Sequence, residues 1–176
     1  MSVERILETL EKWHKRIRAT HKGHYKDAAR LAANQHRLGI LVVIITSIVG
    51  TGVFASLSTN NPATWMKVVT GALSLTAVVL SALQAYLNYP AKQVTHVLAA
   101  TKLSSLKKRI EEQITIGGDE DELKAFLREI RTEWDSITHG APLMSDDTYS
   151  NTSKPMVTAA EFDFSDESFE AEIEKP

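Results

Sequence analysis

Two long apolar runs interrupt an otherwise charged sequence. Residues 38–57 (LGILVVIITSIVGTGVFASL) and 68–87 (VVTGALSLTAVVLSALQAYL) each contain 20 residues and no Asp, Glu, Lys, Arg or His. An α-helix rises about 1.5 Å per residue, so each run spans about 30 Å, the thickness of a bilayer's hydrocarbon core. A helix buried in a soluble protein usually carries a polar, charged stripe, which neither run has. We therefore predict transmembrane helices at residues 38–57 and 68–87.

The segment between the runs, residues 58–67, predicts a tight turn because it contains the turn formers Asn60, Asn61 and Pro62. Basic residues indicate the orientation. Residues 1–37 contain nine Lys and Arg, residues 58–67 contain one, and residues 92–109 contain five. Because Lys and Arg stay on the cytoplasmic side, we expect both termini in the cytoplasm and the loop outside.

Residues 3–18 predict a helix whose apolar positions recur at alternating spacings of three and four. These positions are Val3, Ile6, Leu10, Trp13 and Ile17. Such a helix can lie on the membrane surface through its Lys and Arg, or it can pack on other cytoplasmic helices. The strict spacing favours packing. The Ala-rich residues 22–37 then predict a helical extension of the first span, so residues 1–37 form a basic cytoplasmic segment.

Residues 88–140 predict a helical stalk and a final helix. Pro90 lacks a backbone N–H and predicts a kink after the second span. Gly117-Gly118 ends the stalk, and Asp119 with Glu122 resembles a capping box that opens a helix to about Thr138. The apolar positions are Val94, Leu98, Leu103, Leu106, Ile110 and Ile114, then Leu123, Phe126, Leu127, Ile130, Trp134 and Ile137. We expect the cytoplasmic seams to bury each other in a small bundle.

Residues 141–176 differ in composition from the rest. They contain nine acids and two Lys, and predict an acidic disordered tail. Phe162, Phe164 and Phe169 are either a short docking motif or part of a solvating tail.

The composition excludes several kinds of chemistry. The 176 residues carry a net charge of −2 and no Cys, so there is no disulfide framework and no thiolate zinc site. No P-loop, dinucleotide fingerprint, nucleophile elbow or HExxH occurs, and we predict that the protein is not an enzyme. His21 and His24 are three residues apart without a third ligand at metal-site spacing, so we expect neither a metal nor a cofactor.

Small and polar residues inside the spans are candidates for a pore lining. They are Thr70, Ser74, Ala77, Ser81, Gln84 and Asn88 in and after the second span, and Ser47 and Thr51 in the first. A stripe of this kind avoids lipid, either by packing on another helix or by lining a pore, and the sequence supports both interpretations. If there is a pore, we expect the stripe of the second span to line it, because Gln84 and Asn88 are too polar for passive packing. Two spans cannot enclose a channel, so a pore requires an oligomer.

Basic residues outside the spans form a second candidate site. They are Lys15, Arg16, Arg18, Lys22, Lys26, Arg30, Arg37, Lys107, Lys108 and Arg109. Such residues attract anionic lipid head groups and fix topology. The alternative is a cytoplasmic site for a nucleotide or oligonucleotide, because Arg makes bidentate contacts to phosphate.

This layout resembles the SLATT family, the SMODS- and SLOG-associating two-transmembrane effectors of bacterial defence. The resemblance rests on Trp13, on HKGHYKDAARLAANQHR before the first span, and on LQAYLNYPAKQVTHVLAATKLSSLKKRIEEQI, EWDSI and Ala141-Pro142 after the second. It covers roughly residues 1–145 and leaves the acidic tail out.

The resemblance implies a non-enzymatic, pore-forming effector. Together with the sequence patterns it leads us to predict an all-α, homo-oligomeric channel in the bacterial inner membrane, with a tetramer favoured. A nucleotide or oligonucleotide from a partner nucleotidyltransferase would gate it, and opening would depolarise or damage the membrane of an infected cell. Two other functions fit the same sequence. One is a membrane anchor or scaffold that recruits a cytoplasmic partner, and the other is a holin-like lysis protein.

Overall fold

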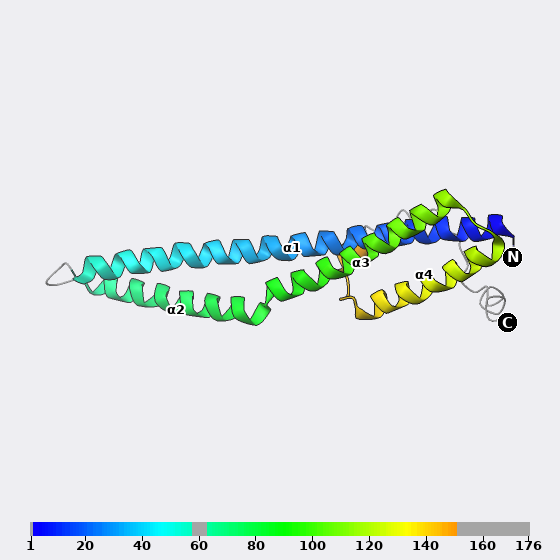
Figure 1. Cartoon of the computed structure of the whole chain (residues 1–176). Coiled ribbons are helices and arrows are strands. Elements are labelled where there is room, and N and C mark those ends of the chain that lie inside the picture. The colour runs from blue at the N-terminus through cyan, green and yellow to red at the C-terminus, as the bar shows by residue number, and fades with distance from the viewer. Residues whose placement is uncertain (1, 58–62, 151–176) are drawn as a thin grey trace. The chain divides into compact units, whose positions relative to one another are not determined.

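The computed structural model describes residues 2–57 and 63–150 (Figure 1). These ranges contain four long helices: α1 (Val3–Leu57), α2 (Thr64–Leu87), α3 (Tyr89–Ile116) and α4 (Glu120–Gly140). No strand occurs in the described residues, which confirms the all-α class. The chain divides into two compact units. We name them the bundle unit, with described residues 2–24 and 99–150, and the hairpin unit, with described residues 25–57 and 63–98.

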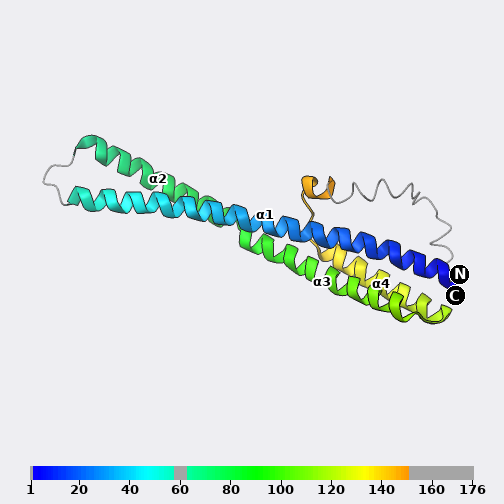
Figure 2. The same cartoon turned by 90° about the horizontal axis from the view of Figure 1, so that it is seen from above.

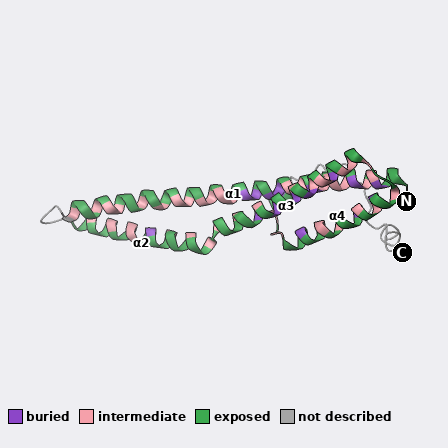
Figure 3. Ribbon diagram, viewed as in Figure 1, coloured by how far each residue is buried: buried purple, intermediate pink, exposed green. Residues whose placement is uncertain are grey.

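The bundle unit is built from the first turns of α1, most of α3 and all of α4, which lie side by side (Figure 2). Their apolar seams meet in one core, coloured as buried in Figure 3. Its buried members are Ile6, Leu10, Ile17, Leu103, Leu106, Ile110, Leu123, Leu127, Ile130 and Ile137. The predicted bundle is therefore confirmed, and the first helix packs on α3 and α4 as its spacing favoured. Trp13 and Trp134 pack edge to face beside the core, with ring centroids 5.8 Å apart.

The seam of α3 begins later than the sequence predicted. Val94 and Leu98 are both 55% exposed, whereas Ala99 and Ala100 are buried. Val94 and Leu98 belong to the hairpin unit, and the buried apolar positions of α3 in the bundle unit begin at Ala99. The expected places of Val94 and Leu98 in the cytoplasmic core were wrong.

The connection between α3 and α4 follows the predicted signals. Gly117 has a φ of +76°, which glycine adopts without strain, and its N–H donates to the Gln113 carbonyl at 2.9 Å. Asp119 then caps α4, because its side chain accepts from the Glu122 N–H while the Glu122 carboxylate accepts from the Asp119 N–H. The predicted helix end and capping box are confirmed.

The hairpin unit pairs residues 25–57 of α1 with α2 in antiparallel orientation (Figure 1). Both helices are long and apolar enough to cross a membrane. The less exposed positions include sets spaced alternately by three and four. On α1 they are Leu31, Gln35, Leu38, Val42, Ile45, Val49, Gly52 and Ser56, and on α2 they are Met66, Thr70, Leu73, Ala77, Leu80, Gln84 and Leu87. This spacing is that of two helices packed along one seam, which we call the hairpin seam.

Small residues fix how the two helices align. A Cβ built on Gly52 would lie 3.1 Å from the Thr70 hydroxyl oxygen, and one built on Gly39 would lie 4.0 Å from the Gln84 amide nitrogen. Close approach at glycine is a common means of packing helices in membranes. The outer surface of the hairpin is apolar, with exposed residues such as Val43 and Phe54 on α1.

A break, and not the predicted kink, separates α2 from α3. Asn88 adopts a left-handed conformation with a φ of 45°, and its N–H donates to the Gln84 carbonyl at 3.3 Å. Asparagine tolerates this conformation better than most residues. Pro90 then lies in the first turn of α3, where a missing N–H costs nothing. The two local preferences together end one helix and start the next.

Two other boundaries differ from expectation. Helix α2 begins at Thr64, inside the segment expected as a loop, while the predicted turn formers at residues 60–62 lie outside the described residues. Residues 146–150 form a helical turn, although the sequence predicted a disordered tail from residue 141. Thr148 in this turn is fully buried, and the Ser145 hydroxyl donates to its side-chain oxygen at 2.9 Å. A local cap and burial thus order a segment whose composition is polar.

Candidate functional site

The predicted polar stripe of α2 is divided between two environments. Thr70, Ala77 and Gln84 occupy the hairpin seam, where they face α1 of the same protomer, and Ala77 is only 7% exposed. Ser74 is half-buried beside the seam, whereas Ser81 and Asn88 are exposed. Packing within the hairpin therefore accounts for the three seam residues, and the exposed members are the ones that a second subunit or water can reach.

The hydroxyl residues of α1 face outward. Ser47 and Thr51 are exposed one turn apart, and their hydroxyls donate to the carbonyls of Val43 and Ser47 at 2.7 and 2.9 Å. A hydroxyl bonded to its own helix is satisfied in lipid and remains able to accept a bond from water. Thr46 and Thr76 are also exposed and bonded in this way. Neither belongs to the predicted pore lining, because both lie off the faces that Ser47 and Thr51 and the stripe of the second span define.

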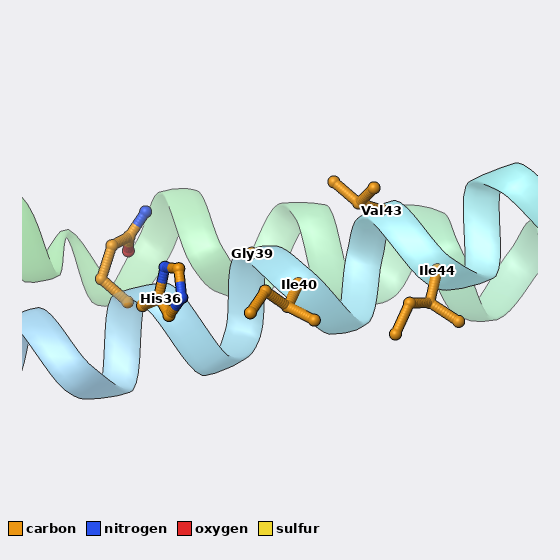
Figure 4. A pocket seen from close by; sticks show the side chains of 6 residues that line it. His36, Gly39, Ile40, Val43 and Ile44 are labelled. Carbon is orange, nitrogen blue, oxygen red and sulfur yellow. The ribbon is translucent and has the colours of Figure 1, made fainter.

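A groove opens on α1 near the start of the first apolar run. It has a volume of about 410 Å³, and Figure 4 shows its lining residues along one helix. They are Gln35, His36, Gly39, Ile40, Val43 and Ile44. The side-chain oxygen of Gln35 is buried and has no hydrogen-bond partner among the described residues. The groove is apolar apart from this amide and His36, and its floor exists because Gly39 has no side chain.

In the bundle unit, basic residues of α1 and α3 converge along one edge of the helix pair. His14 Nε2 lies 2.9 Å from Glu111 Oε1, and Lys107 Nζ lies 3.8 Å from the same oxygen. The two helices are antiparallel, so the His14–Glu111 contact places Arg18, one turn further along α1, opposite Lys107, one turn back along α3. We call this the α1–α3 basic edge; it comprises His14, Arg18, His21, Lys22, Lys107 and Glu111.

Electrostatic effects within the α1–α3 basic edge show that its members are close together. The pKa of Glu111 is held below its ordinary value by the hydrogen bond from His14 and by the positive charges of Lys107 and Arg18. The pKa of His21 is lowered by burial and by repulsion from Lys107 and Lys22. The edge therefore concentrates positive charge around one carboxylate.

Other predicted basic residues have structural partners in the bundle unit. The Arg109 guanidinium donates to Glu129 at 2.6 Å and to Glu133, and the hydrogen bond to Glu129 is the largest cause of its raised pKa. This fork ties α3 to α4. Arg16 lies over the Trp134 ring at 5.9 Å.

The remaining basic candidates are divided between the two units. Lys15 and Lys108 are exposed in the bundle unit, and Lys26, Arg30 and Arg37 belong to the hairpin unit.

Buried titratable groups were not anticipated from the sequence. In the hairpin unit, Asp27 is 4% exposed and His96 is 7% exposed. Burial lowers the pKa of His96, and the negative charge of Asp27 opposes that shift. Asp27 is the only acid among residues 22–37, which is the one signal that could have marked it. His24, in the bundle unit, is 3% exposed. The described residues hold no cluster of three potential metal ligands.

These features agree with a family match over most of the chain. Residues 6–168 match the model of the SMODS and SLOG-associating 2TM effector domain family 4. The chain belongs to this SLATT family. It is thus a two-transmembrane effector, a membrane protein of defence systems that associates with SMODS and SLOG partners. The SLATT match extends past residue 145 into the acidic tail, which the sequence resemblance had left out. No curated protein and no solved structure matches the chain.

Proposed function

We propose that this SLATT protein is a non-enzymatic effector that assembles into a pore, most simply a tetramer, in the bacterial inner membrane. Both termini lie in the cytoplasm, following the distribution of Lys and Arg. A nucleotide or oligonucleotide made by a partner nucleotidyltransferase gates the pore. Opening depolarises the membrane of an infected cell, as the family's role in defence systems suggests.

The outward hydroxyl pair of α1 is the observation that carries this proposal. Ser47 and Thr51 lie on the exposed surface of the hairpin, one turn apart and near the middle of an apolar run. A single hairpin leaves these hydroxyls in lipid, whereas a ring of hairpins turns them toward a common axis. Their spare lone pairs then face water, and the apolar residues elsewhere on the surface face lipid or a neighbouring subunit.

Ion flux through purified protein in liposomes tests the proposal. We expect flux that depends on nucleotide, and we expect the double substitution of Ser47 and Thr51 by Leu to abolish it. The matched control is Thr76→Leu, which replaces an exposed hydroxyl on α2 and should leave flux within about twofold.

The outcomes separate the proposed pore from its alternatives. If no ion flux is detected whether nucleotides are added or removed, the pore is refuted and a membrane scaffold is favoured. If a chain lacking residues 91–140 still lyses cells, a holin-like activity is favoured.

A further inference from the structure

We infer that the α1–α3 basic edge binds a soluble phosphate-bearing ligand, and that Glu111 occupies this site as an internal competitor. The inference deepens the proposed function, because it gives the gating ligand a site and a means of regulation. It is independent of which residues line the pore.

The first argument is the opposition of like charges. Arg18 and Lys107 lie opposite each other across the antiparallel pair, and Lys107 is close enough to His21 to disfavour protonation of its imidazole. Like charges on neighbouring helices destabilise the pair unless an anion lies between them. Only one carboxylate of the basic edge, that of Glu111, lies among these charges, whereas the single guanidinium of Arg109 is paired with two acids of α4. The charge excess is therefore a feature that an anion would use.

The second argument is the position of Glu111. Its carboxylate accepts from His14 and lies near Lys107, so it occupies the place that a phosphate oxygen would take. The Glu111 side chain is 49% exposed, and rotation about its side-chain bonds can withdraw it into water. A phosphate carries more charge and more acceptor oxygens than one carboxylate, so it competes effectively for the same donors.

The third argument concerns the source of the phosphate. A lipid head group and a soluble nucleotide offer the same chemistry. Helix α1 is uninterrupted, and Lys22 precedes the first apolar residue, Leu38, by 16 residues, or about 24 Å of helix rise. The polar head-group layer is only about 5–8 Å thick on each side of the bilayer. Along the sequence the basic edge is therefore well separated from the first apolar residue, which favours a soluble ligand, and the experiment below distinguishes the two sources.

The test is calorimetric titration of the full-length chain, in nanodiscs of phosphatidylcholine, with inorganic tripolyphosphate as the probe. We expect saturable binding that Glu111→Gln strengthens about fivefold, the effect of removing one partly exposed ion pair from competition. Arg18→Ala and Lys107→Ala should each weaken binding at least tenfold. The matched control is Glu8→Gln, which removes a carboxylate paired with Lys12 at 2.8 Å outside the basic edge and should change nothing.

Several results would overturn the inference. They are the absence of saturable binding, equal affinities for Glu111→Gln and the unaltered chain, and equal effects of Glu8→Gln and Glu111→Gln. A head-group site is the answer if the Arg18 and Lys107 variants bind phosphatidylglycerol vesicles less tightly but keep the affinity for tripolyphosphate.

The Glu111→Gln arm protects the test against misfolding, because a gain in affinity requires a folded bundle. Flux measured on the same variants separates this inference from the proposed pore. Binding without flux refutes only the pore, and flux without binding refutes only the site.

Discussion

Replacement of Gly52 by leucine should open the hairpin seam, whereas the same change at Gly50 should not. A Cβ at position 52 would lie 3.1 Å from the Thr70 hydroxyl oxygen and 3.8 Å from its methyl carbon, while one at position 50 meets nothing within 4 Å. Leucine adds three further carbons at a contact that is already short. Overpacking of this kind costs about 1–3 kcal/mol.

The comparison of two glycines on one helix removes the other effects of the substitution. Both changes gain the same helix propensity, about 1 kcal/mol, and both add the same apolar surface. The free energy of unfolding should therefore fall by about 1–3 kcal/mol in Gly52→Leu relative to Gly50→Leu. Gly52→Ala should be less destabilising than Gly52→Leu, since the Thr70 side chain needs to move only slightly.

The assay follows separation of the two spans directly. The chain has no Cys, so fluorophores can be attached at Arg37→Cys and Tyr86→Cys, two exposed positions near the start of the first apolar run and the end of the second. Energy transfer between the labels, recorded while SDS is titrated into protein held in a mild detergent, gives the unfolding midpoint. Equal midpoints for the two leucine variants, or a lower midpoint for Gly50→Leu, would refute the alignment of α1 on α2.

Three further outcomes are expected. Leu106→Ala removes a fully buried core side chain and should lower the free energy of unfolding of the bundle by about 2–5 kcal/mol in a urea titration, while Ser105→Ala, on the exposed side, should stay within about 0.5 kcal/mol. Asn88→Val should cost about 1–2 kcal/mol because a β-branched residue resists the left-handed conformation, and Asn88→Gly should cost nothing; equal SDS midpoints would contradict the break. The lowered pKa of Glu111 means that its ionised carboxylate stabilises the fold. This stabilisation is present above the unperturbed glutamate pKa of about 4.3 and is lost as the pH falls below that value, so the melting temperature of Glu111→Gln should drop less on acidification than that of the unaltered chain.

Much of the architecture could be predicted from local patterns. The seams of Ile6, Leu10 and Ile17 and of the last helix recur at the spacing of one helical face, and only packing between helices explains buried seams flanked by charge. The end of α3 at Gly117 and the start of α4 at Asp119 depend on backbone chemistry within a few residues. All the residues that produce these local signals lie close together in the sequence, so the signals could be read without the structure, and the structure confirms them.

The polar stripe of α2 shows where the sequence became insufficient. A helix that packs on its neighbour and one that lines a pore both collect small and polar residues at spacings of three and four. The pattern identifies a face and gives no information on what covers it. Only the alignment of Gly52 with Thr70 and of Gly39 with Gln84 assigns that face to α1.

The basic candidates raised the same difficulty in another form. Arg18 and Arg109 cannot be distinguished by residue type in the sequence. In the structure Arg18 faces Lys107, whereas Arg109 is paired with Glu129 and Glu133. Partners on another helix decide the role, and their position depends on the antiparallel alignment of α1, α3 and α4. Thr148 was missed for a related reason, because burial of a polar residue in a short turn leaves no periodic signal.

The two glycine contacts of the hairpin restrict how α1 and α2 can move relative to each other. Gly39 and Gly52 are separated by about 20 Å along α1, and each accommodates one polar side chain from α2. Sliding of α1 along α2 would move Thr70 away from Gly52 and Gln84 away from Gly39, and would push both side chains against bulkier residues at the same time. The two helices therefore resist sliding along each other, and the motion that remains is tilting or rotation of the hairpin as one rigid body.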